Sequence, residues 1–233
     1  FIHGGPFANI AHGNSSIIGD RLALGAADIV VTEAGFGSDM GAEKFMHIKA
    51  ANSGKAPDCV VMNVTVRSMK LHGGAFGSRG GYRPSREELD AEDIEAVKRG
   101  AQGNLDRHIR NMAGFGMPVI VSINRFTADT DGELDALSAA ARASGAHAVT
   151  LTEVHANGGK GGEPLAKAVV SAIQDHVAAG RPFTPLFLKD APVMEKVNGI
   201  AKRIYKAEGV DVEAKAKKQL AAIESWGYGH LPV

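Results

Sequence analysis

The sequence predicts an α/β fold in which helices cover both faces of a parallel sheet, giving three layers. Three apolar runs, at residues 58–66, 118–124 and 147–153, have the length of strands. They are apolar almost throughout rather than at every second position, which is typical of strands covered on both faces. Segments with helix-start signals alternate with these runs, and this alternation indicates a parallel sheet.

The N-terminal part predicts one further strand between two helices. Asn14, Ser15 and Ser16 offer N-cap side chains for a helix that runs to about Leu24. An apolar run at residues 26–31 predicts a buried strand, and residues 42–51 predict a helix after a glycine-rich turn. Together with the later strands, this pattern predicts two α/β units.

The C-terminal part has clear helix boundaries. Capping-box spacing at Ser85 and Glu88 predicts helical structure from 87 to about 112, and the same spacing at Thr130 and Glu133 precedes a helix at 134–144. The remaining predictions are a flexible glycine loop at 158–162 and helices at 164–179, 193–208 and 212–225. We expect a domain boundary after residue 106, giving domains 1–106 and 107–233.

Composition excludes several classes of partner. The 233 residues carry no net charge and no long basic run, which argues against nucleic acid or an anionic membrane as the main partner. The single cysteine, Cys59, rules out an intrachain disulfide framework and a cysteine-rich metal site, and it fits a reducing, cytoplasmic compartment. The chain starts at Phe1 in functional-looking sequence, so we expect it to be a piece of a longer protein.

Two glycine-rich stretches are candidate ligand sites. Residues 32–45 follow a predicted strand, and α/β proteins bind ligands at the carboxyl ends of their strands. Residues 3–16 contain His12 and Asn9 before a helix start, where free backbone N–H groups bind anions such as phosphate. In both stretches, an ordinary capped loop with solvated charges is the alternative.

Cations and one aromatic residue stand at the ends of later strands. Arg67, Lys70 and His72 follow the strand at 58–66 and would steady phosphate or acyl-phosphate oxygens, or form only a solvated basic turn. Phe126 follows the strand at 118–124 and would stack a flat heterocycle, or be a core residue. His155 follows the next strand, where a purely structural role is the alternative.

Nucleotide signatures are incomplete. Asn124-Arg125 only partly matches the Asn-Lys-x-Asp pattern that reads guanine, which makes a GTPase-like switch a weak alternative. No Gly-x-x-x-x-Gly-Lys-Ser/Thr loop occurs, and no catalytic triad or metal-ligand pattern stands out. The residues alone therefore predict an α/β protein that binds an anionic and aromatic ligand at its strand ends.

Three blocks closely resemble the formate–tetrahydrofolate ligase (formyltetrahydrofolate synthetase) family. They are GGPFANIAHGNSS at 4–16, TEAGFGSDMGAEKF at 32–45 and TVRSMKLHGG at 65–74. The third is similar to the family signature Ala-Thr-Val-Arg-Ala-Leu-Lys-x-His-Gly-Gly, from which Val64, Ser68 and Met69 depart conservatively. The resemblance runs the length of the chain and implies a P-loop NTPase-like or Rossmann-like fold.

The resemblance implies a C–N bond-forming ligase of one-carbon metabolism. ATP would phosphorylate formate, and N10 of tetrahydrofolate would attack the formyl phosphate. It also implies Mg²⁺ with ATP, stimulation by a monovalent cation (K⁺ or NH₄⁺), and a homotetramer. The phosphate loop belongs to the family's N-terminal part, which this chain lacks, so we expect the chain to be inactive by itself. A non-catalytic folate- or nucleotide-binding protein of the same family is the alternative.

The resemblance also implies roles for individual residues. His12 matches a histidine near the family's active site, Phe126 the aromatic that stacks on folate, and Leu151 an apolar contact beside it. His155 stands where many members have Trp or another large aromatic, which would weaken stacking. We complete the prediction with the following residues: catalytic His12, Arg67 and Lys70; folate-binding Phe36, Gly37 and Asp39, with Phe126, Leu151 and His155; nucleotide-binding Asn9, Gly13, Asn14 and Ser15.

Overall fold

The computed structural model describes residues 12, 14–35, 37–77 and 84–233. They form two compact units, the first from residues 1–57 and 183–233 and the second from Asp58–Pro182. Three predicted site residues, Asn9, Gly13 and Phe36, lie outside the described residues.

The second unit contains a parallel sheet, which confirms the predicted α/β fold. Its strands are β1 (Val60–Val64), β2 (Val119–Asn124) and β3 (Ala148–Thr152), in the order β1-β2-β3. The central strand β2 is buried at every position except Asn124, because it pairs with a strand on each edge and helices cover both of its faces. All three strands therefore end at the same edge of the sheet.

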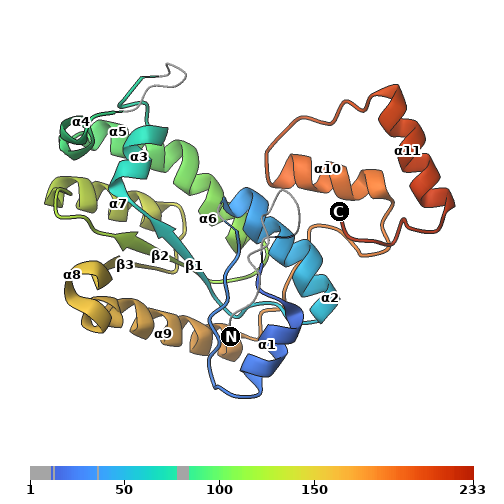
Figure 1. The fold of residues 1–233 in the computed structure, drawn as a ribbon, viewed down its shortest axis with the longest axis horizontal. Coiled ribbons are helices and arrows are strands. Elements are labelled where there is room, and N and C mark those ends of the chain that lie inside the picture. The colour runs from blue at the N-terminus through green and yellow to red at the C-terminus, as the bar shows by residue number, and fades with distance from the viewer. Residues whose placement is uncertain (1–11, 13, 36, 78–83) are drawn as a thin grey trace. The chain divides into compact units, whose positions relative to one another are not determined.

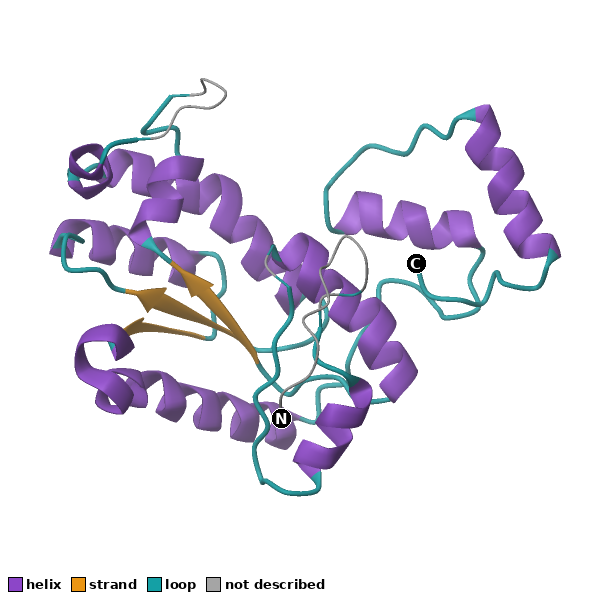
Figure 2. Cartoon of the chain, in the orientation of Figure 1, coloured by secondary structure: helices purple, strands orange, loops and turns teal. Residues whose placement is uncertain are grey.

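Helices cover this sheet on two sides. In Figure 1, α9 (Glu163–Ala179) lies on one side of the strands, and α6 (Asp106–Ala113) and α7 (Asp131–Ala143) lie on the other. The remaining helical segments of the unit are α3 (Val66–His72), α4 (Arg86–Asp90), α5 (Ile94–Gly100), the π-helical η3 (Ala101–Leu105), α8 (Val154–Asn157) and the 3₁₀ segment η4 (Gly158–Gly162). Figure 2 shows how strongly helix dominates the chain.

Local sequence explains where these helices begin. Both predicted capping boxes form: Ser85 with Glu88 at α4, and Thr130 with Glu133 at α7. A third, Thr65 with Ser68, opens α3. Each box satisfies backbone N–H groups that the first helical turn leaves unpaired.

The first unit contains only helices and irregular backbone among its described residues. Its elements are α1 (Ile17–Leu24), the π-helical η1 (Ser38–Ala42) and η2 (Phe45–Ala50), α2 (Ala51–Ser53), α10 (Val193–Arg203) and α11 (Ala214–Ser225). The ring of His47 stacks on Phe187 at 4.5 Å, and the buried Lys196 ammonium donates to the carbonyls of Gly229 and Leu231. The ring stack joins the N-terminal and C-terminal segments of the unit, and the Lys196 hydrogen bonds tie α10 to the end of the C-terminal segment.

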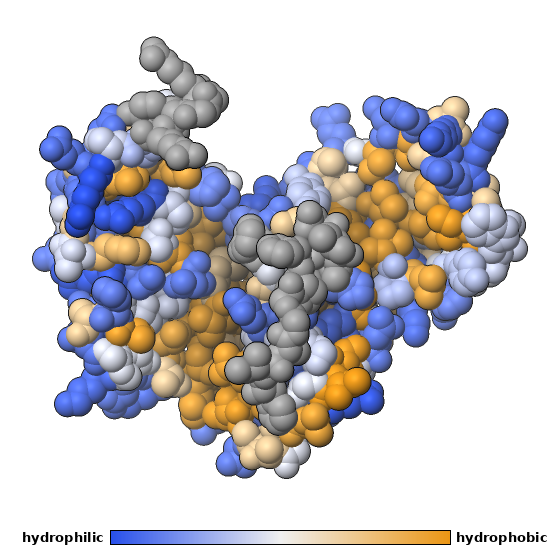
Figure 3. All heavy atoms as spheres, in the orientation of Figure 1, coloured by the Kyte–Doolittle hydropathy of each residue, from blue (hydrophilic) through white to orange (hydrophobic). Residues whose placement is uncertain are grey.

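The strand predicted from the apolar run at 26–31 is wrong. The segment makes no strand, and the side chain of Val31 is 92% exposed. A strand needs a neighbour for its backbone groups, and the described part of this unit supplies only an isolated bridge between Asn14 and Ala34. Exposed apolar side chains consequently gather on α1 and the segment after it, where Figure 3 shows orange surface: Ile18, Leu22, Leu24, Ile29 and Val31.

Three smaller expectations are also corrected. The strand expected at 58–66 is shorter, at Val60–Val64, and the residues that follow it form α3 because the Thr65 capping box starts a helix there. The helix expected at 42–51 is largely π-helical, and the spacing of apolar residues does not distinguish a π-helix from an α-helix. Residues 158–162 form a 3₁₀ turn instead of a flexible loop, held partly by the hydrogen bond from Glu153 N to Gly161 O.

The division into units differs from the predicted domains. The boundary expected after residue 106 falls inside the second unit, at the start of α6. The predicted domain boundary after residue 106 stays a prediction for the complete chains of the family. No helix in the described part of the chain combines the length and apolar character that a membrane crossing requires.

Candidate functional site

The carboxyl edge of the sheet brings together predicted site residues from three strands. Arg67 follows β1, Phe126 follows β2, and Leu151 lies near the end of β3 with His155 just beyond it in α8. Phe126 and Leu151 each keep 38% of their surface exposed, although large apolar side chains are usually buried. This edge therefore offers an apolar and aromatic surface beside a cation.

Phe126 is held firmly at this edge. Its backbone N–H donates to Asp129 Oδ2 at 2.8 Å, and its carbonyl accepts from the backbone N–H of Asp129 at 3.1 Å. The guanidinium of Arg67 lies over the phenyl ring, with Cζ 4.7 Å from the ring centroid. Burial raises the pKa of Asp129, against the opposing effect of the hydrogen bond from Phe126.

Arg67 is itself fixed by an acidic partner. Its Nη2 lies 2.5 Å from Asp90 Oδ1, and both side chains are largely covered, at 29% and 26% exposure. The hydrogen bond from Arg67 lowers the pKa of Asp90, so that carboxylate stays ionised at neutral pH. No acceptor for Arg67 Nε occurs among the described residues.

Lys70 does not face the same edge as a free cation. Its ammonium is 2.7 Å from Glu133 Oε1 and donates to the carbonyls of Leu89 at 3.1 Å and Ala91 at 2.7 Å. These partners use all three N–H donors of a lysine, and the residue is 1% exposed. The position of Lys70 favours a structural role over the catalytic role that the sequence predicts.

Polar ties connect the ends of β2 and β3. Ser122 Oγ and Thr152 Oγ1 lie 3.1 Å apart, and Arg125 N donates to Thr152 O at 3.1 Å. The Arg125 guanidinium reaches Glu153 at 3.4 Å and Asp131 at 3.5 Å. Arg125 therefore pairs with carboxylates of its own unit, which further weakens the alternative of a GTPase-like switch that reads guanine.

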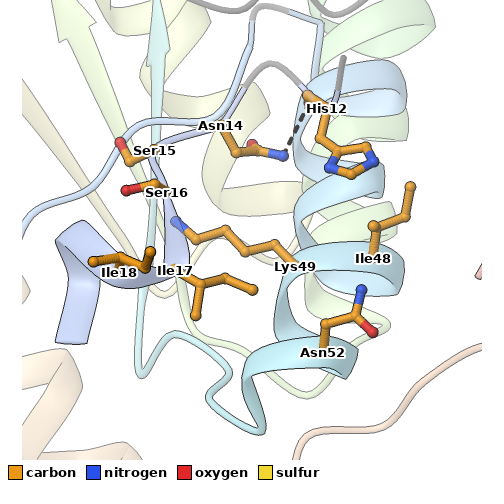
Figure 4. Close-up of a pocket in the computed structure, with 9 residues that line it drawn as sticks. All are labelled: His12, Asn14, Ser15, Ser16, Ile17, Ile18, Ile48, Lys49 and Asn52. Atoms are coloured by element: carbon orange, nitrogen blue, oxygen red, sulfur yellow. Dashed lines mark hydrogen bonds between the residues drawn. The ribbon is translucent and has the colours of Figure 1, made fainter. Parts of the chain in front are cut away.

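The first unit contains a pocket of about 340 Å³ near the start of α1 (Figure 4). It brings together three predicted residues, His12, Asn14 and Ser15. Asn14 Nδ2 donates to the carbonyl of His12 at 3.0 Å, while Asn14 Oδ1 is buried without a partner among the described residues. Lys49 also lines the pocket, and sequence reasoning did not single it out.

Lys49 is the charged element of this pocket. The side chain is 5% exposed, and its ammonium lies 2.6 Å from Asp20 Oδ2 and 4.4 Å from the centroid of the Phe45 ring. A weaker hydrogen bond joins it to Thr32 at 3.3 Å. The pocket is therefore polar, with its cation already neutralised by Asp20.

The glycine-rich turn adopts the backbone that its glycines permit. Gly37 has φ +78°, in the left-handed region, and precedes η1. At Gly41 an added Cβ would lie 1.8 Å from the carbonyl oxygen of Gly35, so only glycine fits there. The carbonyl of Asp39 accepts from the hydroxyl of Tyr205 at 3.1 Å. Two of the predicted folate residues, Gly37 and Asp39, thus lie in the turn that brings Gly35 and Gly41 close together.

Sequence reasoning missed Asp90 and Asp129, the two carboxylates that hold Arg67 and Phe126. Asp129 lies three residues after Phe126, a spacing at which Asp side chains commonly hydrogen-bond nearby backbone groups. Asp90 is 23 residues from Arg67, and no local pattern indicates that pairing. No cluster of three or more His, Cys, Asp or Glu side chains able to hold a metal occurs in the described ranges.

Comparisons with known proteins point to one family. A model of the family described as formate–tetrahydrofolate ligase matches residues 1–233. The chain is 47% identical over 233 residues to the formate–tetrahydrofolate ligase of Ruegeria sp. (strain TM1040) and 48% identical over 233 residues to that of Roseobacter denitrificans. It is 44% identical over 232 residues to that of Desulforamulus reducens. All of this chain is covered in each case, but the chain spans only 39–40% of the length of these relatives.

Proposed function

Because the chain belongs to the formate–tetrahydrofolate ligase family, we propose that it forms the folate-side part of such an enzyme and one wall of its nucleotide site. Phe126, Leu151 and His155 would bind folate, together with Phe36, Gly37 and Asp39. Asn9, Gly13, Asn14 and Ser15 would bind the nucleotide. His12 beside the nucleotide residues and Arg67 beside Phe126 would be catalytic.

The proposed reaction proceeds in two steps. Formate attacks the γ-phosphorus of ATP, giving formyl phosphate and ADP. N10 of tetrahydrofolate then attacks the formyl carbon, phosphate leaves with the C–O bonding pair, and N10 loses a proton. Phosphate is a good leaving group and the oxygen of free formate is a poor one, which explains why ATP is needed. The protein positions the amine and stabilises charge on the tetrahedral intermediate.

One observation supports the folate side above the others: Phe126 is exposed yet rigidly held. An aromatic ring at a strand end that is tied by Asp129 and covered on one face by Arg67 is a preformed stacking surface. Stacking on such a ring contributes about 0.5–1.5 kcal/mol beyond burial. Leu151 adds exposed apolar surface on the neighbouring strand.

The nucleotide side rests on the pocket at the start of α1. Asn14 and Ser15 offer an amide and a hydroxyl there, and His12 offers an imidazole. Mg²⁺ would arrive with the ATP phosphates, as this ion commonly does. The monovalent cation, the homotetramer and the cytoplasmic location follow from the family resemblance.

Binding of tetrahydrofolate to this chain tests the folate side. Phe126→Ala should weaken binding about three- to tenfold, as expected for loss of one stacked ring. Tyr228→Ala is the matched control, because Tyr228 is an aromatic residue of the other unit that is 53% exposed. Isothermal titration calorimetry gives both dissociation constants. Equal affinities of the wild type and Phe126→Ala would contradict the proposal.

Formation of 10-formyltetrahydrofolate distinguishes the ligase from the alternative of a non-catalytic binding protein. That alternative is favoured by His155, which replaces a large aromatic and is exposed. The assay supplies ATP, formate and tetrahydrofolate to this chain and to the product of the complete parent gene. We expect turnover only by the complete product. If neither turns over while the chain still binds tetrahydrofolate, the binding protein is correct.

A further inference from the structure

Phe126 is held by groups that come from three separate parts of the second unit. Asp129 ties its backbone, and Arg67 from α3 covers one face of its ring. Asp90, at the end of α4, in turn holds Arg67. Arg67 therefore covers one face of the ring, while Phe126 as a whole keeps 38% of its surface exposed.

The orientation of Arg67 depends strongly on Asp90. An arginine side chain has many rotamers, and no acceptor for its Nε occurs in the described part of the chain. The close contact between Nη2 and Asp90 Oδ1 is therefore the polar contact that fixes the guanidinium over the ring. Asp90 has a second cationic neighbour, Arg86, but that contact is longer, at 3.4 Å, and the Arg86 side chain is 88% exposed.

We propose that Asp90 is a positioning residue, which holds the Arg67 guanidinium on one face of Phe126 so that a flat heterocyclic ligand stacks on the other face. The inference rests on the proposed function, in which Phe126 stacks the ring system of folate. In this proposal Asp90 acts through its contact with Arg67 and not by binding the ligand itself.

Tetrahydrofolate affinity of the 233-residue chain gives the first readout. Asp90→Asn preserves shape but removes the charge, and we expect binding to weaken about three- to tenfold because Arg67 loses its fixed orientation. Arg67→Met should weaken binding similarly. The double variant should bind no more weakly than Arg67→Met alone, because Asp90 has no effect once Arg67 is absent. Arg86→Gln, the matched control, removes the other neighbour of Asp90 and should leave affinity unchanged.

A second readout requires no ligand. Proton NMR of the Arg67 Nε–H group should show a ring-current shift in the wild type that Phe126→Leu removes. Asp90→Asn should reduce the same shift, while Arg86→Gln leaves it in place. Urea unfolding of each variant identifies any general loss of structure, and an Asp90→Asn chain that is folded but keeps the full shift would overturn the proposal.

The two readouts separate the two levels of inference. If the wild type does not bind tetrahydrofolate, the proposed function is contradicted, and the NMR comparison still decides whether Asp90 positions Arg67. If tetrahydrofolate binds and Phe126→Ala weakens it, but Asp90→Asn binds as tightly as the wild type, the positioning role is wrong. Additive losses in the Asp90→Asn/Arg67→Met double variant would also contradict it.

Discussion

The buried ion pair between Lys70 and Glu133 predicts a large loss of stability when Glu133 is replaced by Gln. Glu133 is fully buried, and its Oε1 accepts from Lys70 Nζ at 2.7 Å and from Asp93 N at 2.9 Å. Its Oε2 accepts from Thr130 N at 3.2 Å. All three partners are donors. A glutamine NH₂ group must therefore point at a donor, and the Lys70 charge loses its counter-ion.

The expected cost follows from this geometry. Removing one partner of a buried ion pair typically costs about 3–5 kcal/mol, because the other charge stays buried without compensation. That is a large share of the roughly 5–15 kcal/mol that separates folded from unfolded domains. Glu95→Gln is the control: Glu95 pairs with Lys98 at 2.8 Å but is 71% exposed, so its loss should cost about 0–1 kcal/mol.

Urea unfolding at neutral pH, followed by circular dichroism, measures both changes. Adding Lys70→Met to Glu133→Gln should recover part of the loss, because it removes the uncompensated charge. The recovery should be incomplete, since the carbonyls of Leu89 and Ala91 then lose their donor. A loss for Glu133→Gln no larger than that for Glu95→Gln would refute the reasoning.

The same pair makes this stability depend on pH. Burial alone would raise the pKa of Glu133, but the hydrogen bonds from Lys70, Asp93 and Thr130 outweigh it and lower that pKa from 4.5. A carboxyl whose pKa is lower in the folded state stabilises fully above its unfolded pKa. The difference in stability between wild type and Glu133→Gln should therefore be constant above about pH 5 and shrink as the pH falls below 4.5.

Two further predictions concern packing and reactivity. Gly100→Ala should destabilise the protein by about 1–3 kcal/mol in urea unfolding, because an added Cβ would lie 2.0 Å from the carbonyl oxygen of Met69; Gly103→Ala, with nothing within 4 Å, should instead stabilise by about 0.5–1 kcal/mol. Equal effects of the two would show that α3 and α5 do not approach so closely. Burial, followed by the charge of Asp58, raises the pKa of Cys59 to about 11. Alkylation of Cys59 by iodoacetamide should therefore be slow at pH 7.5, and its rate should keep rising until the pH reaches about 11. A rate that levels off near pH 9 would contradict this pKa.

Much of the fold was predictable because its signals are local. The three apolar runs became β1, β2 and β3, although only β2 is buried at nearly every position, and β1 and β3 keep exposed side chains such as Val61 and Leu151. The capping boxes at Ser85 and Thr130 form as their spacing indicates. The run at 26–31 carried the same apolar signal and failed, because strand formation also requires a neighbouring strand that the described part of its unit lacks.

The candidate site divides in the same way. The sequence by itself indicated that Arg67 and Phe126 follow strands of one parallel sheet, whose strands end at the same edge, while Leu151 was singled out by the family resemblance. Only the tertiary structure decided that Lys70 forms a buried ion pair with Glu133, and that Asp90 holds Arg67 over Phe126. The reason is physical: whether a segment forms a helix or a strand depends mostly on residues that are close together in the sequence. The partner of a charged side chain depends instead on which distant segment the folded chain brings within about 3 Å.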